Sequence, residues 1–218
     1  MTLSRDAILK QAQFLSFFST PTYVVRLPQA AQINPALKTL ILAKAEAETD
    51  GLMNSNVGGW HSGRDLLHWG GEPMRTLARA AIDCANRLTM DRKGQPQTPS
   101  WQISCWANVN HRGHANRRHS HPGCFWSGTY YVDDGSDAAG ADVAGQFELH
   151  DPRGVAAAVT PAQLAAGERR PSADQTLIRP QTGMMVLFPA WMPHSVRPYR
   201  GDRVRISVAF NLAYDKRG

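Results

Sequence analysis

The sequence predicts a mainly β domain with flanking helices. Two observations support this fold class. Two amphipathic helical segments occupy the first part of the chain, and short aromatic or β-branched runs bounded by Gly, Pro, Asn or Asp follow Pro99. Such runs are typical of an antiparallel sandwich or barrel. A length of 218 residues suits one domain. We therefore expect a helical N-terminal part, about residues 1–98, packed on a β core, about residues 99–213.

The first expected helix spans residues 34–51. Asn34 is a typical capping residue, Pro35 suits the first helical position, and Gly51 can end the helix. A second expected helix spans residues 71–90, where apolar side chains again recur at helical spacing. Two amphipathic helices need an apolar surface to cover, and the β core would provide it.

Five strands are expected in the second part of the chain, at residues 101–110, 125–134, 145–151, 183–189 and 203–212. Residues 153–182 form a long polar and alanine-rich connection in which no strand is evident. Loops of this length in a compact domain are often lids or binding loops.

Composition excludes several classes of protein. The formal net charge of +6 is small for this length, and no nucleic-acid-binding signature accompanies it, so we expect no nucleic-acid partner. Three cysteines are an odd number at no paired spacing, which disfavours a disulfide framework. No run of 18 apolar residues occurs. We expect a soluble, cytoplasmic protein without a membrane partner that acts on a small molecule or peptide, and we leave open whether it forms a homodimer.

Two histidine elements are the most informative feature of the sequence. His119 and His121 are two residues apart, so on a strand both side chains would point to one face, close enough to share a metal ion. His194 follows Pro189 by five residues at the end of another expected strand. Jelly-roll metalloenzymes assemble a single site from separated strands in this way.

The ligand types favour iron or manganese over structural zinc. Structural zinc usually takes a fourth protein ligand, often cysteine, and no cysteine has a suitable spacing. Imidazole ligands with vacant positions suit Fe(II) or Mn(II) in oxygen chemistry, where the usual set is two histidines and one carboxylate. His121 stands where that carboxylate would be expected. Either His119, His121 and His194 hold the metal, which we favour, or a carboxylate such as Asp151 completes a two-histidine set.

The last expected strand alternates in character. One face carries Val204, Ile206, Val208 and Phe210, and the other carries Arg203, Arg205, Ser207, Ala209 and Asn211. The apolar face suits packing against the helices, which would turn the arginines toward the barrel interior. Because a guanidinium matches a carboxylate in a two-point contact, this arrangement indicates a carboxylate-bearing cosubstrate near the metal. The alternative is an edge strand whose arginines form a solvated basic face.

The segment GGWHSGRDLLHWGGEP, residues 58–73, is rich in Gly and Trp and contains His61 and His68. It could border a substrate entrance. We favour a structural loop whose tryptophans cover the core, because buried aromatic side chains dominate packing energetics.

Six segments in combination resemble a known family. They are SNVGGWHS, CWANVN, RHSHPGCFWSGTYYV, FELHDPR, LFPAWMPHSV and RISVAFN. Together they resemble the 2-oxoglutarate- and Fe(II)-dependent oxygenases, in particular a bacterial group related to prolyl and aspartyl hydroxylases, from about residue 18 to residue 212. The resemblance implies a double-stranded β-helix, that is, a cupin-like jelly roll. It also implies Fe(II), 2-oxoglutarate as cosubstrate and O2, used to hydroxylate a C–H bond of a substrate.

The same resemblance implies roles for individual residues at the metal. His119 stands in the place of the first iron ligand and His194 in the place of the distal one. Many relatives have an aspartate where this chain has His121, whereas aspartyl hydroxylases have no carboxylate there.

For the cosubstrate, Arg205 looks like the arginine that binds the distal carboxylate of 2-oxoglutarate, and Ser207 completes an Arg-x-Ser pair. Prolyl hydroxylases would place the basic residue nearer Arg203. Tyr131 resembles the tyrosine that hydrogen-bonds the same carboxylate.

Two alternatives remain open from the sequence. Gly113 and the His119-x-His121 pair match the opening of a cupin motif, although the glutamate expected after the pair is absent and Trp191 replaces a glycine. A cupin-type metalloprotein or dioxygenase that does not use 2-oxoglutarate would employ the same histidines. The other alternative is a jelly-roll binding protein without catalysis.

Overall fold

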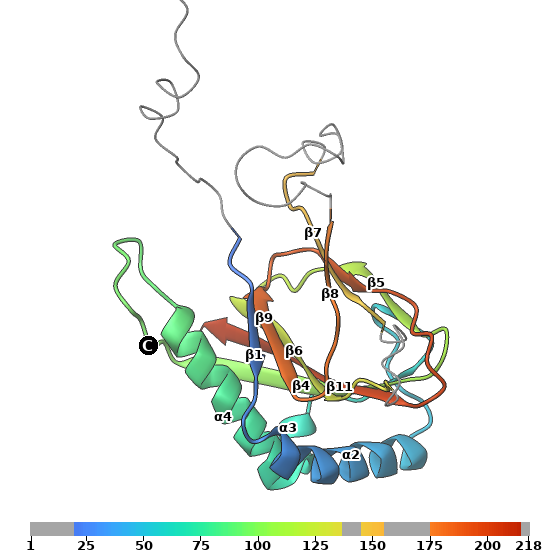
Figure 1. The fold of residues 1–218 in the computed structure, drawn as a ribbon. Helices are drawn as coiled ribbons and strands as arrows, with labels where there is room; N and C mark the ends of the chain where they lie inside the picture. The colour runs from blue at the N-terminus through green and yellow to red at the C-terminus, as the bar shows by residue number, and fades with distance from the viewer. Residues whose placement is uncertain (1–19, 137–144, 155–174, 215–218) are drawn as a thin grey trace, which may run out of the picture.

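The computed structural model describes residues 20–136, 145–154 and 175–214, and they form two antiparallel β-sheets that face each other (Figure 1). The larger sheet has six strands, in the order β1 (Tyr23–Arg26), β9 (Met184–Pro189), β6 (Trp126–Asp133), β11 (Arg205–Tyr214), β4 (Trp101–Asn110) and β3 (Trp60–His61). The smaller sheet has five, in the order β2 (Asn56–Val57), β5 (Ala115–His119), β10 (His194–Val196), β7 (Phe147–His150) and β8 (Gln175–Ile178). This is a jelly-roll arrangement, and the expected mainly β fold is confirmed.

Within the described residues, three helices accompany the sheets: α2 (Ala30–Ala47), the single-turn α3 (Leu66–Trp69) and α4 (Gly71–Leu88). In Figure 1, α2 and α4 lie along the outer face of the larger sheet. Leu37 and Ile41 of α2, Leu77 of α4 and Phe210 of β11 are completely buried in the same apolar cluster. Complete burial of a side chain of this kind contributes about 1.5–3 kcal/mol relative to leaving it exposed, so this layer is the main source of stability. No helix among the described residues is both long enough and apolar enough to span a membrane.

The start of α2 differs from the expectation that Asn34 caps the helix. The helix begins at Ala30, so Asn34 and Pro35 lie inside it. Asn34 is buried, and its side-chain oxygen accepts a hydrogen bond of 2.6 Å from the Tyr130 hydroxyl. A local capping pattern therefore misled the prediction, because the amide is used in a contact with a residue distant in the sequence.

Several strands were not among the five expected from the sequence pattern, namely β1, β2, β3, β5, β8 and β10. β8 lies in the connection where no strand was evident, which corrects that expectation. It pairs with β7 along four residues, from Phe147 opposite Ile178 to His150 opposite Gln175. β1 lies before the first helix and pairs with β9 at the edge of the larger sheet. Both are short edge strands with mixed polarity, so neither shows a clear alternation. Residues 155–174 lie outside the described part of the chain.

The interior between the two sheets has two parts. One is an apolar cluster of Tyr131, Phe147, Leu149, Met184, Val186, Phe188 and Met192. The other is a cavity of about 460 Å³, to which both sheets contribute. A volume of this size is in the usual range for a small-molecule site.

Candidate functional site

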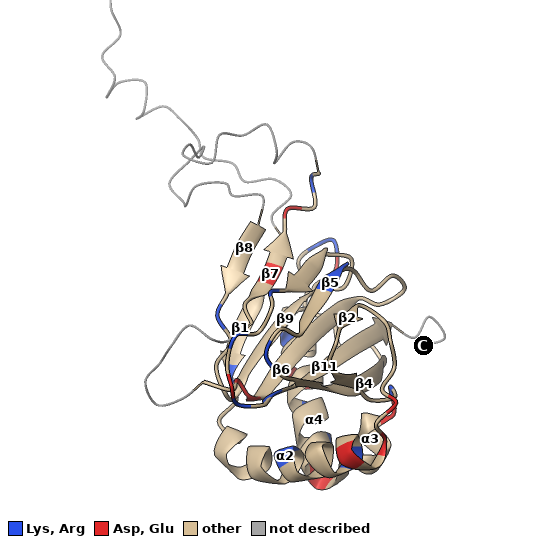
Figure 2. Ribbon diagram, turned by 90° about the vertical axis from the view of Figure 1, so that its right-hand side faces the viewer, with Lys and Arg blue, Asp and Glu red and all other residues tan. Residues whose placement is uncertain are grey.

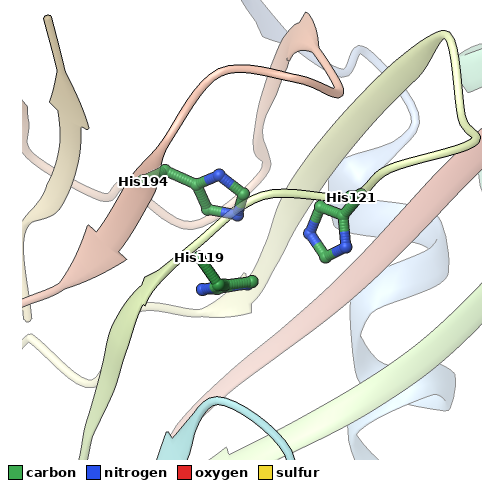
Figure 3. Close-up of side chains that lie close together, drawn as sticks. All are labelled: His119, His121 and His194. Carbon is green, nitrogen blue, oxygen red and sulfur yellow. The ribbon is translucent and has the colours of Figure 1, made fainter. Parts of the chain in front are cut away.

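Three histidines meet in the cavity (Figure 3). His119 is the last residue of β5 and pairs with His194 of β10 in the register of the smaller sheet. His121 lies just beyond the end of β5, where its backbone N–H donates a 2.8 Å hydrogen bond to the Ala190 carbonyl in the β9–β10 connection. Sheet pairing and this backbone bond therefore bring together residues that lie more than 70 positions apart in the sequence.

The spacing of the rings suits a shared ion. The ring centroids of His119 and His194 are 4.2 Å apart. The ring centroid of His121 lies 5.0 Å from that of His119 and 5.1 Å from that of His194. One nitrogen from each ring lies within 4.8 Å of the other two. Metal–nitrogen bonds of about 2.1 Å put three nitrogens around one ion about 3.0–3.6 Å apart, so nitrogens as far apart as 4.8 Å would have to approach one another by roughly 1 Å when an ion binds.

Backbone carbonyls orient two of the three rings. Nδ1 of His119 lies 2.7 Å from the Arg117 carbonyl oxygen, and Nδ1 of His194 lies 2.9 Å from the Met192 carbonyl oxygen. A carbonyl only accepts, so each Nδ1 carries the proton and each Nε2 has a lone pair, which in His119 lies 3.4 Å from the Ser55 hydroxyl. Histidine ligands of metal sites are commonly oriented by such bonds.

All three imidazoles are held in the neutral form that binds metals. Burial, with a smaller effect from His119, lowers the pKa of His194 to about 3. Burial, followed by the effects of His119 and Arg64, lowers the pKa of His121 to about 4. Burial also lowers the pKa of His119, against the opposing effect of its hydrogen bond to the Arg117 carbonyl. At neutral pH no proton therefore needs to leave before a metal ion binds.

Asp151, the alternative third ligand, is not part of this cluster. Its carboxylate accepts hydrogen bonds from Nε of Arg153 at 2.9 and 3.1 Å, and the Arg153 backbone N–H adds another at 2.9 Å. The hydrogen bond from the Arg153 side chain keeps the pKa of Asp151 below its usual range. The carboxylate is thus occupied by its own neighbour.

The alternation expected for the last strand is present from Arg205 onward. Ile206, Val208, Phe210 and Leu212 pack in the cluster under the helices. Arg205, Ser207 and Ala209 line the cavity. Arg203 precedes β11 and lies outside the cavity. Its exposed guanidinium donates to the Ser136 carbonyl at 2.9 Å and lies 3.5 Å from Asp133.

Arg205 is almost completely buried, with 2% of its surface exposed. Its Nη1 donates to the side-chain oxygen of Asn110 at 3.2 Å, and its guanidinium carbon lies 5.1 Å from the centre of the Tyr131 ring. Among the described residues it has no acidic partner, and its Nε has no hydrogen-bond acceptor. The Tyr131 hydroxyl and the side-chain oxygen of Asn211 are also buried without a partner. Unpaired buried groups of this kind are costly, so the unpaired atoms of Arg205 and Tyr131, whose side chains lie against each other, indicate that a ligand completes this pair.

The segment interpreted as a structural loop contributes directly to the cavity, which sequence reasoning missed. His61 in β3 and Arg64 both line it. His61 is buried, and its ring stacks on that of Trp106 with centroids 5.6 Å apart. The signal is weak in the sequence because β3 has only two residues, and its position depends on pairing with β4, where His61 lies opposite Asn108. His68 is exposed and is not among the residues that line the cavity.

Comparison with solved structures shows that the fold is shared. A prolyl hydroxylase from Trichoplax adhaerens, in complex with a peptide fragment of hypoxia inducible factor, has a TM-score of 0.61 and 14% identity, covering 90% of this chain and 84% of that one. A prolyl-4-hydroxylase from Pseudomonas putida has a TM-score of 0.55 and 17% identity, covering 90% and 92%. HygX from Streptomyces hygroscopicus, with nickel and 2-oxoglutarate bound, has a TM-score of 0.58 and 10% identity, covering 99% and 88%.

Sequence comparison identifies the family. No curated protein matches the chain. Residues 104–211, which run from β4 through most of β11, match the family model described as "Putative 2OG-Fe(II) oxygenase". This segment contains all three clustered histidines and Arg205. The match assigns residues 104–211 to the 2OG-Fe(II) oxygenase family, and the solved structures show separately that the chain has the double-stranded β-helix fold.

Proposed function

We propose that this protein is an oxygenase that binds Fe(II) through His119, His121 and His194 and hydroxylates a C–H bond of its substrate at the expense of 2-oxoglutarate and O2. One observation carries the assignment of roles. A cluster of three neutral histidines and a buried arginine without an acidic partner line the same cavity. The first group suits a divalent metal ion, and the second suits the carboxylate of an oxoacid.

The donor set fits Fe(II) without a carboxylate. Three imidazoles that line the cavity leave room for further ligands on an ion bound between them. His121 takes the position that an aspartate holds in many relatives. The bound ion would therefore keep both of its positive charges within this ligand set, because none of the three ligands is a carboxylate.

Arg205 supports binding of 2-oxoglutarate. Its guanidinium can bind the distal carboxylate of the cosubstrate in a two-point contact, which would supply the missing acceptor for Nε. The Tyr131 hydroxyl can donate to the same carboxylate, because it is buried without another partner and its ring lies against Arg205. Ser207 lies two residues further along the same face of β11 and is also buried.

Chemically, Fe(II) when bound supplies the activation of O2 that ends in oxidation of the substrate. The protein holds the reactants in place. The carbonyls of Arg117 and Met192 fix the ligand rings, and Arg205 fixes the far end of the cosubstrate. The neighbouring apolar cluster, which includes Phe147 and Phe188, limits access of water from the inner side of the cavity.

The direct test is formation of succinate from 2-oxoglutarate. The protein is reconstituted with Fe(II) under anaerobic conditions, 2-oxoglutarate is added, and succinate is measured after O2 is admitted. We expect succinate to form slowly even without the substrate and to depend on Fe(II). The matched control is Arg205→Lys, which should bind iron normally and form less succinate at limiting 2-oxoglutarate.

Two results would redirect the assignment. Stoichiometric iron binding without any affinity for 2-oxoglutarate would favour a cupin-type metalloprotein. Absence of stoichiometric binding of any transition metal would favour a jelly-roll protein that binds its ligand without catalysis.

A further inference from the structure

The cavity is strongly basic. Four arginines line it, namely Arg64, Arg117, Arg118 and Arg205, and no Asp or Glu among the described residues does so. None of the first three takes part in the ion pairs found within the described part of the chain. Some exposed arginines elsewhere, namely Arg75, Arg79 and Arg112, are paired with a carboxylate, whereas others, such as Arg87 and Arg92, form no ion pair within the described part of the chain.

The reactants proposed above do not neutralise this charge. Fe(II) brings two positive charges to a ligand set without a carboxylate, and 2-oxoglutarate brings two negative ones, so these two cancel. Arg205 is the group that the cosubstrate would engage. Three further arginines at the cavity are left without a negative charge, which the substrate can supply.

Arg64 is the best placed of the three. Its guanidinium lies over the ring of Trp106, 5.7 Å from the ring centre. Trp106 is itself buried and is fixed by stacking on His61. The same indole ring is 5.8 Å from the ring of His121, a proposed metal ligand. Trp106 therefore holds Arg64 close to the metal ligands and restricts the freedom of an otherwise exposed side chain.

Arg117 and Arg118 lie on β5, directly before His119. In Figure 2, strand β5 of the smaller sheet carries a basic segment, drawn in blue. Exposed arginines alone would be an ordinary solvated surface. Here they line the same cavity as Arg64 and lie on the strand that ends in a metal ligand, so the positive potential is concentrated at the site.

We propose that the substrate is a small anionic molecule, and that Arg64 binds its carboxylate or phosphate group, with Arg117 and Arg118 adding to the attraction. This inference rests on the proposed function, because it assigns the substrate class of the same cavity. A fork of guanidinium donors supported by an aromatic ring suits planar carboxylates and phosphates alike.

Calorimetry on protein loaded with Mn(II) and saturated with 2-oxoglutarate tests this proposal. Mn(II) has the charge of Fe(II), and saturating 2-oxoglutarate occupies Arg205. The probes are two pairs of similar shape that differ in charge: O-phospho-L-serine with L-serine, and L-aspartate with L-asparagine. We expect one or both anions to bind in the millimolar range or better, and their uncharged partners to give no measurable heat. The pair that responds distinguishes phosphate from carboxylate.

Arg64→Gln should weaken binding of the responding anion by roughly tenfold or more, because a hydrogen bond to a charged group is lost. Arg92→Gln is the matched control, since it removes the same charge from an exposed position outside the cavity and should change nothing. The proposal is overturned if neither anion binds, if the uncharged partners bind equally well, or if Arg64→Gln binds the anion as the unmodified protein does.

A preceding titration with 2-oxoglutarate separates this proposal from the proposed function. If 2-oxoglutarate binds the Mn(II) protein and the anions fail, only the substrate class is wrong. If 2-oxoglutarate itself does not bind, the oxygenase roles assigned to the site are wrong, and the anion titrations then report on the basic cavity alone.

Discussion

The two faces of β11 differ in how completely their side chains are satisfied within the protein. Toward the helices, Ile206, Val208, Phe210 and Leu212 are completely buried among other apolar side chains. On the opposite face, Arg205, which lines the cavity, and Asn211, which does not, are also buried, and each leaves a polar atom without a partner among the described residues. The apolar face therefore completes its contacts when the chain folds. On the other face, Arg205 lines the cavity with a donor that only a ligand could pair.

This difference teaches where stability and function reside. Burial of apolar surface stabilises the fold, whereas an unpaired buried polar group lowers stability until a ligand pairs with it. Substitutions on the apolar face of β11 should therefore change the free energy of unfolding, whereas substitutions on the cavity face should change ligand binding, even where the residues are adjacent in the strand. Four substitutions test this separation, in order of decreasing expected effect.

Phe210→Ala should lower the free energy of unfolding by about 3–5 kcal/mol, as expected for removal of a fully buried aromatic ring. The ring lies over Gly128 of β6, where a Cβ atom would come within 2.3 Å of it, so no neighbouring side chain at that position can fill the space left behind. Urea or thermal unfolding measures the change. A decrease in unfolding free energy below about 1 kcal/mol would contradict the role of this face in stability. Loss of metal from protein that is still folded would contradict the assignment of metal binding to the cavity side alone.

His194→Ala should weaken binding of Fe(II) by roughly a hundredfold or more, because a direct ligand is lost where even an orienting partner can be worth 10–100-fold. The free energy of unfolding should change much less than for Phe210→Ala. Elemental analysis after desalting and an unfolding curve measure the two quantities. His68→Ala is the control, since His68 is exposed and outside the cavity. Full iron content in His194→Ala would disprove the proposed ligand set.

Arg205→Lys should raise the Kd for 2-oxoglutarate roughly tenfold while the iron content stays normal, because lysine keeps the charge but not the two-point contact. Arg203→Lys is the matched control two residues earlier, on an exposed side chain outside the cavity. Calorimetry on metal-loaded protein gives both values. Equal effects at the two positions, or a larger effect at Arg203, would mean that the cavity face does not bind the cosubstrate.

Asp151→Asn should have the smallest effect. The pair with Arg153 involves an exposed guanidinium, so its removal should cost at most about 1 kcal/mol at pH 7. The hydrogen bond from Arg153 lowers the pKa of Asp151 in the folded protein, so the contribution is present above the unfolded pKa of about 3.9 and is lost as pH falls through the folded value. The difference in unfolding free energy between the two proteins should therefore shrink at about pH 3.

The same Asp151→Asn protein sharpens the ligand assignment. We expect it to retain full iron content, because the carboxylate is bound to Arg153 and is not part of the histidine cluster. Loss of iron would instead favour a site of two histidines and one carboxylate.

The sequence predicted the features that depend on short-range periodicity. Alternation along β11 identified the face that packs under the helices and the face that carries Arg205, and the His-x-His spacing identified two members of the cluster. The fold class followed from the strand-like runs. Placing His194 beside His119 needed only the expectation of a jelly roll.

Other features depended on contacts that no local pattern encodes. Arg203 was grouped with Arg205 because alternation was continued two residues before the point where β11 begins. Arg64 and His61 were assigned to a structural loop, since their place in the cavity depends on a two-residue strand and on stacking with Trp106. Asn34 was predicted to cap the helix because the local pattern resembles a helix start. Its actual hydrogen bond is to Tyr130, which lies 96 positions away in the sequence, so no local pattern could indicate it.

The carbonyls of Arg117 and Met192 have a consequence for how the protein acquires its ion. They belong to backbone segments that the sheet and the adjoining turn already order, so the rings of His119 and His194, two of the proposed ligands, are oriented before any metal binds. In a zinc finger the ion assembles its own site, and binding and folding are one event. Here the ordering of the ligands is part of chain folding, so a chelator should abolish activity without unfolding the chain. Metallation would then be reversible, and the ion occupying the site would follow the supply of divalent metals around the folded protein.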